Sequence, residues 1–267
     1  MNDKITKVGF IGCGNMGGAI ARAISKVLQT KLYISEPNQE KAAEISKEIG
    51  CKISSGNKIC EECDYVFLAI KPNLIETVVP PLRASLEKGN ATLVTMAAGV
   101  AIAKLEALVG KMPIIRIMPN TPVAVGKGMI TWCKNELVGD ECAEEFKRLF
   151  SEAGVLDEIG ENMIDAASAV AGCGPAFVYA FIEALADGGV QCGLPRDKAM
   201  TYAANTLIGA AETVLKTGKH PGLLKDEVCS PGGSTIEGMH ALESAGFRGI
   251  SAEAVVAAYE KTKKLGK

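Results

Sequence analysis

A glycine-rich turn between an apolar run and a helix constrains the fold of this chain more than any other feature. Residues 7–19, KVGFIGCGNMGGA, hold Gly12, Gly14 and Gly17 in the spacing G-x-G-x-x-G. In such a turn the first glycine permits a tight bend, the second lets the backbone approach a pyrophosphate, and the third brings helix close to strand. Because a helix N-terminus carries free N–H groups and a partial positive charge, the turn predicts a dinucleotide-binding site.

A carboxylate follows this turn where a dinucleotide would place its adenosine ribose. Residues 31–35, KLYIS, are predicted as the second strand, and Glu36 comes directly after them, about 20 residues beyond the glycines. A carboxylate there accepts hydrogen bonds from the ribose hydroxyls of NADH and repels the 2′-phosphate of NADPH. No arginine lies in residues 35–40, and Lys41 is the nearest cation. The sequence therefore favours NADH.

The first half of the chain alternates strands and helices, as in a doubly wound parallel sheet of the α/β class with both faces covered. We predict strands at residues 8–11, 31–35, 64–70, 91–96 and 114–118, which 128–133 and 155–159 could extend, and helices at 16–28, 39–49 and 140–153. The carboxyl ends of parallel strands form the ligand crevice, which makes Lys71, Ala97, Ala98 and Asn120 candidate neighbours of a ligand. Ordinary turn chemistry would explain any one of these residues by itself. Their clustering at one edge of the sheet favours a ligand.

The alternation stops near residue 160, so we predict a Rossmann-type domain over residues 1–160 and an all-helical domain over 161–267. In the second, residues 175–185 are apolar nearly all round, with Glu183 the only charge, and 199–215 are rich in alanine. A domain of about 100 residues cannot bury such helices on every side within one copy. We therefore expect a homodimer, which could assemble further. The run Gly172 to Pro175 predicts the end of one helix and the start of another.

Composition excludes several other classes of protein. The 267 residues are 48% hydrophobic with a formal charge of −2, which leaves no basic surface for nucleic acid. No apolar run approaches the roughly 18 residues that cross a bilayer, and the first strand starts too early to leave room for a signal peptide. Nine cysteines scattered through the predicted elements indicate reduced thiols and a cytoplasmic protein.

A metal centre is not expected either. Cys60 and Cys63 form a C-x-x-C pair without a second pair or a nearby histidine, so an ordinary helical segment explains them better than zinc. The chain has only two histidines, His220 and His240, and neither lies near other ligand types.

A second glycine turn lies in the helical half. Residues 230–235, SPGGST, form a tight turn that feeds a helix, so hydroxyls and backbone N–H groups converge at a helix N-terminus. A plain helix cap by Ser234 or Thr235 would need only one hydroxyl. The richer loop favours a bound carboxylate.

At this point the sequence resembles the pyrroline-5-carboxylate reductases over nearly its whole length. The resemblance is carried by the glycine turn and by AIKP, AAG, RIMPNTP, EALADGGV, GLP and SPGGST, at residues 69–72, 97–99, 116–122, 183–190, 193–195 and 230–235. The glycine turn is common to many dehydrogenases. The combination of MPNTP with SPGG-x-T is much more specific.

The resemblance implies a Rossmann domain followed by a helical dimerisation domain. The implied reaction is hydride transfer from NADH or NADPH to C5 of 1-pyrroline-5-carboxylate, giving L-proline. The implied substrate residues are Glu161, Ser234 and Thr235, with Ser230 and Gly233 shaping a carboxylate pocket. The implied cofactor residues are Ile11, Gly12, Cys13, Gly14, Asn15, Met16, Gly17, Ser35, Glu36, Pro37, Asn57, Ala69, Ile70, Lys71, Pro72, Met96, Ala97 and Ala98.

The chemistry suits these residues, because a protonated cyclic imine is already electrophilic and needs mainly orientation. Thr235 is the implied catalytic residue, with a hydrogen bond to the ring nitrogen. The chain departs from the family's pattern at three places. Ala171 and Cys173 replace serines, Glu227 stands where asparagine is common, and Glu36 replaces a small or basic residue.

Two other interpretations remain open from sequence. One is a related Rossmann dehydrogenase acting on a β-hydroxy acid, which would need a catalytic lysine. Lys198 and Lys216 are available for that role, but neither lies in a recognisable glycine or asparagine context. The other is a nucleotide-binding protein that has lost catalysis, which the changes at Ala171 and Cys173 encourage.

Overall fold

The computed structural model describes residues 5–265 and divides into two compact units. The first unit runs to Cys173 and also includes the C-terminal stretch from Ala258, and the second is Gly174–Ala257. The domain boundary predicted at residue 160 lies one helix earlier in the chain, and it stays a prediction.

The first unit is built on a mostly parallel sheet, as the sequence predicts. Within the described residues the sheet has eight strands in the order β3-β2-β1-β4-β5-β6-β7-β8, and only the β6–β7 pairing is antiparallel. Their bounds are β1 (Thr6–Ile11), β2 (Thr30–Ser35), β3 (Lys52–Ile53), β4 (Tyr65–Leu68), β5 (Thr92–Thr95), β6 (Ile114–Met118), β7 (Gly128–Lys134) and β8 (Gly154–Glu158). The seven predicted strands are confirmed. Sequence reasoning missed β3, because its two residues are exposed and show no apolar pattern.

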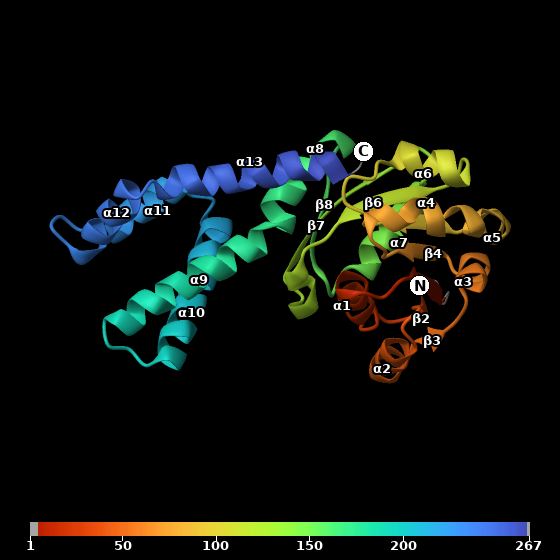
Figure 1. Ribbon diagram of the computed structural model, residues 1–267, viewed down its shortest axis with the longest axis horizontal. Helices are drawn as coiled ribbons and strands as arrows, with labels where there is room; N and C mark the ends of the chain where they lie inside the picture. Colours follow the sequence, from red (N-terminus) through yellow and green to blue (C-terminus); the bar gives the residue numbers. More distant parts are fainter. Residues whose placement is uncertain (1–4, 266–267) are drawn as a thin grey trace. The chain divides into compact units, whose positions relative to one another are not determined.

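Helices cover both faces of this sheet (Figure 1). One apolar core lies against α1 (Asn15–Ile24), α2 (Gln39–Ile49) and α7 (Asp140–Leu149). The other lies against α3 (Gly56–Glu62), α4 (Ile75–Val78), α5 (Arg83–Gly89), α6 (Ile102–Val109), α8 (Glu161–Ala167) and the 3-10 turn Pro80–Leu82. Two further 3-10 turns are Pro72–Leu74 and Thr121–Val125, and Val123 of the latter belongs to the first core. Side chains of the central strands alternate between the two cores: in β4, Phe67 lies on one face and Val66 and Leu68 lie on the other. The sequence placed the ends of α1 and α7 four residues too late, at 28 and 153, because apolar residues continue past the last regular turn.

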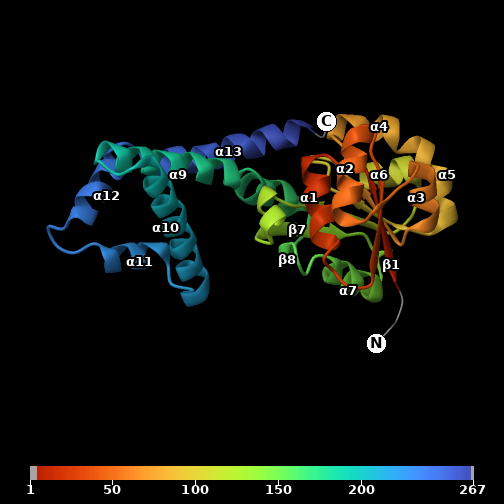
Figure 2. The same cartoon turned by 90° about the horizontal axis from the view of Figure 1, so that it is seen from below.

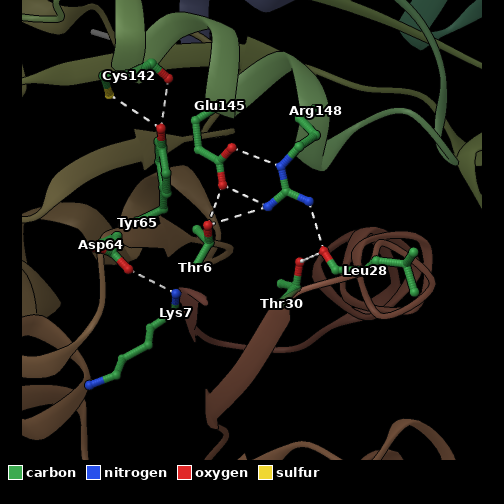
Figure 3. A network of polar contacts seen from close by, with 9 residues as sticks. All are labelled: Thr6, Lys7, Leu28, Thr30, Asp64, Tyr65, Cys142, Glu145 and Arg148. Atoms are coloured by element: carbon green, nitrogen blue, oxygen red, sulfur yellow. Dashed lines mark hydrogen bonds and ion pairs between the residues drawn. The ribbon is translucent and has the colours of Figure 1, made fainter. Parts of the chain in front are cut away.

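A polar network ties the amino ends of the strands to α7 (Figure 3). Arg148 donates to both carboxylate oxygens of Glu145, at 2.7 Å each, and to the carbonyl of Leu28. The hydroxyl of Thr6 in β1 donates to Glu145, and the hydroxyl of Tyr65 in β4 donates to the carbonyl of Cys142 at 2.6 Å. These contacts lie at the edge opposite the glycine turn, so they position the sheet and not a ligand.

The described part of the second unit contains helices alone, as the sequence predicts. They are α9 (Gly174–Gln191), α10 (Arg196–Thr217), α11 (Pro221–Val228), α12 (Ser234–Ser244) and α13 (Phe247–Leu265), the last of which continues into the first unit. Figure 1 shows the turn that joins α9 to α10, and Figure 2 shows the same two helices from below. The buried apolar cluster of this unit is small, formed by Ala186, Ala199 and Ala203, while Tyr179 and Ile208 are each 58% exposed. One copy of the unit therefore leaves its apolar helices uncovered.

The predicted break at Gly172 to Pro175 is confirmed in part: α9 starts at Gly174 with Pro175 in its first turn, but the chain before it does not leave the helical path. The chain stays helical through a π-helical segment, Ser168–Gly172, and the N–H of Cys173 bonds to the carbonyl of Ser168 at 3.0 Å. A π segment absorbs an extra residue without ending the helix. The glycines therefore loosen the helix instead of stopping it.

The expectation that no segment is long and apolar enough to cross a membrane is also corrected. Glu161–Gln191 is one helical stretch of 31 residues whose most apolar 18-residue window has a mean hydropathy of 1.6. The finding rests on length and composition alone, and a helix buried in a protein interface meets the same two criteria.

Candidate functional site

The glycine turn has the geometry that its spacing predicts. Gly12 has φ of +81°, and a Cβ there would lie 2.8 Å from the carbonyl oxygen of Ala69. A Cβ on Gly17 would lie 2.6 Å from the Cβ of Ala69, so α1 approaches the end of β4 closely. Among residues 5–265, no atom beyond Gly14 itself and its immediate neighbours in the chain and helix lies within 4 Å of the Cβ position at Gly14, which is the N-cap of α1. Open space in front of a helix N-terminus suits a pyrophosphate.

The structure brings the candidate cofactor residues to one edge of the sheet, at the carboxyl ends of four neighbouring parallel strands. The N–H of Gly12 bonds to the carbonyl of Ser35 at 2.8 Å, and the N–H of Ala69 bonds to the carbonyl of Ile11 at 2.9 Å. A Cβ on Gly56 would contact both Ile11 and Ser35. The remaining candidates follow the same strand ends or the start of α3: Cys13, Asn15, Met16, Glu36, Pro37, Asn57, Ile70, Lys71, Pro72, Met96, Ala97 and Ala98.

The Glu36 carboxylate lies against the glycine turn. Its Oε2 accepts a 2.8 Å hydrogen bond from the N–H of Cys13, and its Oε1 accepts a 3.1 Å bond from the N–H of Asn38. Asn38 in turn caps α2 by accepting a bond from the N–H of Lys41. A negative charge is thus held at the end of β2 by two backbone donors.

Cys13 is not the exposed, acidic thiol that a helix N-terminus would produce. Its side chain is fully buried within the core beside α1, and this burial raises the pKa of the thiol to about 11. The adjacent Cys51 and the negative charge of Glu36 raise the pKa further. A helix N-terminus gives a reactive thiol only where the thiol is exposed, so the buried Cys13 is not one.

Asn120, a candidate ligand neighbour, is used inside the protein. Its Oδ1 accepts from the N–H of Met129 at 2.9 Å, and its Nδ2 donates to the carbonyl of Ala171 at 3.0 Å. The side chain is buried. We therefore correct its role from ligand contact to a link between the end of β6 and the π segment.

The second glycine turn has the form that the sequence predicts. The N–H of Gly233 bonds to the carbonyl of Ser230 at 3.0 Å, and Gly232 has φ of +66°, as a type II turn requires at its third residue. The N-cap of α12 is Gly233, and no side chain caps this helix. Within the described residues the hydroxyls of Ser230, Ser234 and Thr235 make no hydrogen bond, so the alternative of a plain hydroxyl cap is wrong.

Glu161 is the first residue of α8 and is held by two groups of the first unit. Its Oε1 accepts from the backbone N–H of Ile102 at 2.7 Å and from Nη1 of Arg116 at 3.2 Å. Nη2 of Arg116 donates to Oδ1 of Asp165 at 2.6 Å. Sequence reasoning assigned no role to Arg116 or Asp165. The available signal was a single arginine inside the otherwise apolar strand IIRIM.

Comparisons with known proteins cover nearly the whole chain. A family model described as pyrroline-5-carboxylate reductase dimerisation matches residues 161–265, and one described as NADP oxidoreductase, coenzyme F420-dependent, matches residues 7–99. A pyrroline-5-carboxylate reductase of Escherichia coli strain K12 is 40% identical over 266 residues, which is 98% of this chain and 98% of its own length. One from Arabidopsis thaliana is 40% identical over 97% of this chain and 95% of its own.

The chain belongs to the pyrroline-5-carboxylate reductase family.

A solved structure supports the same conclusion. Plasmodium falciparum pyrroline carboxylate reductase, with NADP bound, matches with a TM-score of 0.90 and 34% identity over 98% of each chain. As a pyrroline-5-carboxylate reductase, this chain reduces 1-pyrroline-5-carboxylate to L-proline by hydride transfer from NADH or NADPH, the last step of proline synthesis. It forms a homodimer through the helical segment matched by the dimerisation model.

Family membership accounts for two features that the fold leaves open. A dimer interface explains why the helices of the second unit expose apolar side chains in a single copy and why Glu161–Gln191 is so apolar.

The comparisons do not favour a β-hydroxy acid dehydrogenase. Lys216, one of the two lysines available for that alternative, pairs with Glu212 at 2.6 Å on an exposed face of α10.

Proposed function

We propose that this pyrroline-5-carboxylate reductase uses NADH in preference to NADPH, and that Glu36 sets the preference. The supporting observation is the pair of backbone hydrogen bonds, from Cys13 and Asn38, that hold the Glu36 carboxylate beside the glycine turn. A fixed carboxylate accepts hydrogen bonds from the ribose hydroxyls of NADH. The 2′-phosphate of NADPH would meet it as a like charge.

The size of the preference follows from solvation. Glu36 is half-buried, so water screens part of the repulsion, and Lys41 offsets some of it from one helical turn away. We expect about 1 to 2 kcal/mol of discrimination, or roughly tenfold in kcat/KM. The relative with bound NADP shows that the family also includes proteins that bind that nucleotide.

The test is kcat/KM for NADH and NADPH in the wild type and in three variants. Glu36→Ser removes the charge and the acceptor, and Glu36→Gln removes the charge but keeps an oxygen for the N–H of Cys13. Both should shift the ratio toward NADPH by about tenfold. Glu40→Ser is the matched control, because Glu40 is exposed in the first turn of α2 and has the same charge. A wild type that prefers NADPH, or an unchanged ratio in both Glu36 variants, would show the assignment to be wrong.

The proposed cofactor residues are the glycine turn and the neighbouring strand ends given above. The bound nucleotide supplies the hydride. Residues 11–17 would hold its pyrophosphate through the N–H groups of the first turn of α1, and the open space at Gly14 fits this role. The ends of β4 and β5 would orient the nicotinamide, through residues 69–72 and 96–98.

The proposed substrate residues in the second unit are Ser230, Gly233, Ser234 and Thr235. The free N–H groups at the start of α12 suit the carboxylate of the substrate. We propose that the hydroxyl of Thr235 bonds to the ring nitrogen, which orients the imine for attack at C5. Two observations support these substrate residues: the family resemblance, and the fact that the hydroxyls of Ser230, Ser234 and Thr235 make no hydrogen bond within the described residues.

We also propose that the enzyme works in the cytoplasm. Its nine cysteines are all unpaired in the structure, as expected for a protein kept in a reducing compartment. Subcellular fractionation with an antibody against the chain tests this, and recovery from a secreted or membrane fraction would contradict it.

A further inference from the structure

Arg116 is a charged side chain inside an apolar strand. It lies at the centre of β6, between Ile115 and Ile117, and its side chain is 3% exposed. Ile115 and Ile117 face one core of the sheet, while Ile114 and Met118 face the other, the side toward which Arg116 also points. A buried charge is costly unless it is paired, so its partners identify the reason for its presence.

Both partners of Arg116 come from one helix, α8. Glu161 and Asp165 are four residues apart, so they lie on the same face of that helix. Nη1 of Arg116 reaches Glu161 and Nη2 reaches Asp165. The two carboxylates and one guanidinium leave the cluster with a formal charge of −1.

Only one oxygen of Glu161 is used in these contacts. Oε1 accepts from both Ile102 and Arg116, and within residues 5–265 Oε2 makes no hydrogen bond. The side chain of Glu161 is 34% exposed, whereas that of Arg116 is buried. The buried arginine thus holds one oxygen of a carboxylate whose other oxygen is left for solvent or a ligand.

The cluster is not arranged for stability alone. Nε of Arg116 is buried and has no hydrogen-bond partner in the described part of the chain. A buried donor without a partner is unfavourable, and an apolar residue of similar volume is often as stable as a buried ion pair. An arginine kept under these conditions points to a role for the carboxylate that it holds.

We propose that Arg116 is a positioning residue that fixes Glu161 so that Oε2 faces the positive charge of the substrate's ring nitrogen. This inference rests on the proposed function and on the substrate contact of Glu161 that the family resemblance implies. The net charge of −1 in the cluster favours a cationic ring, both as the protonated imine and as the product ammonium. The nitrogen of the saturated product carries two N–H bonds. The hydroxyl of Thr235 accepts only one of them, which leaves the other for Oε2 of Glu161.

The experiment compares two inhibitors that differ only at the ring nitrogen. L-Proline carries a cationic nitrogen, and tetrahydrofuran-2-carboxylate has a neutral oxygen in its place. Their competitive inhibition constants against pyrroline-5-carboxylate are measured for the wild type, Arg116→Met and Arg116→Lys. Arg83→Met is the control, because Arg83 also pairs with a glutamate, Glu87, on the exposed surface of α5.

In Arg116→Met the inhibition constant of L-proline should rise about tenfold, as expected for a weakened charge-assisted contact. That of tetrahydrofuran-2-carboxylate should change less than twofold, and so should the KM for NADH. Arg116→Lys should recover part of the loss, and Arg83→Met should match the wild type. A purely structural role would weaken both inhibitors equally, and that result overturns the inference.

A second variant, Asp165→Asn, tests the inference if Arg116→Met does not fold. Asp165→Asn leaves Arg116 and Glu161 paired but weakens the second anchor of the guanidinium, so it should give a smaller loss confined to L-proline. If Asp165→Asn raises the inhibition constants of both compounds by the same factor, or changes neither, the inference is overturned, provided that the wild type is active. A wild type that reduces no pyrroline-5-carboxylate overturns the proposed function as well, so the two failures are distinguishable.

Discussion

The backbone N–H of Cys13 donates a 2.8 Å hydrogen bond to Oε2 of Glu36, which links the glycine turn to the end of the neighbouring strand. The contact joins residues 23 positions apart in the sequence. It also places a carboxylate close to the N-terminus of α1, where the helix dipole stabilises negative charge. The turn and the proposed selector of the nucleotide are therefore one structural unit.

The burial of Cys13 predicts slow alkylation of its thiol. With the pKa raised to about 11, only about one thiol in ten thousand is ionised at pH 7. Labelling by iodoacetamide, followed by peptide mass spectrometry, should be slow both with and without NADH. Protein unfolded in urea provides the rate for a free thiol. Rapid labelling of the native protein that NADH suppresses would show instead that the thiol is exposed at the nucleotide site.

Thr235→Ala should fold normally and lose much of the catalytic rate. One lost neutral hydrogen bond is on the order of 1 kcal/mol, and the loss is several times larger if the bond strengthens in the transition state. Thr213→Ala on α10 is a matched control, because the hydroxyl of Thr213 bonds only to the carbonyl of Gly209 in its own helix. Wild-type kcat/KM in Thr235→Ala would remove this hydroxyl from the mechanism.

The dimer is predicted to be obligate, because the second unit buries little apolar surface in one copy. Light scattering of the wild type at micromolar concentration should show no folded monomer. Ile208→Glu places a charge on an exposed apolar position of α10 and should weaken the dimer. Leu28→Glu is the control, since Leu28 is 84% exposed and lies outside the helical unit. A well-folded, active monomer in either the wild type or Ile208→Glu would contradict the prediction.

Tyr65→Phe should cost about 1 kcal/mol of unfolding free energy near neutral pH, because the hydroxyl loses its bond to the carbonyl of Cys142. Burial raises the pKa of Tyr65 above its ordinary value of 10.0. The unfolded phenol therefore ionises first, and the contribution of Tyr65 is complete below pH 10 and falls as the pH rises beyond it. The difference between wild type and variant should shrink above pH 10. Urea unfolding across pH measures this, with Tyr33→Phe, whose hydroxyl makes no hydrogen bond within the described residues, as control.

An unchanged unfolding free energy in Tyr65→Phe at neutral pH would show that the bond to Cys142 contributes nothing. Tyr33→Phe should stay within about 0.5 kcal/mol of the wild type.

Local pattern in the sequence was enough to predict the sheet and the edge at which the carboxyl ends of its parallel strands meet. The spacing of Gly12, Gly14 and Gly17 specifies a turn whose geometry depends on adjacent residues alone, and apolar runs such as IIRIM identify strands that are buried on both faces. Parallel pairing then brings the carboxyl ends of those strands together. These inferences succeed because each rests on short-range chemistry repeated along the chain.

Contacts between distant residues were decided only by the tertiary structure. The sequence does not indicate that Arg116 bonds to Glu161, 45 positions away. Nor does it indicate that the side-chain amide of Asn120 donates to the carbonyl of Ala171, 51 positions away. The same holds for Cys13: the charge of a helix N-terminus lowers the pKa of an exposed thiol, but packing buries this one and raises its pKa. Spacing and composition describe what a residue can do. Its neighbours in space determine the solvation, the partners and the charge that decide what it does.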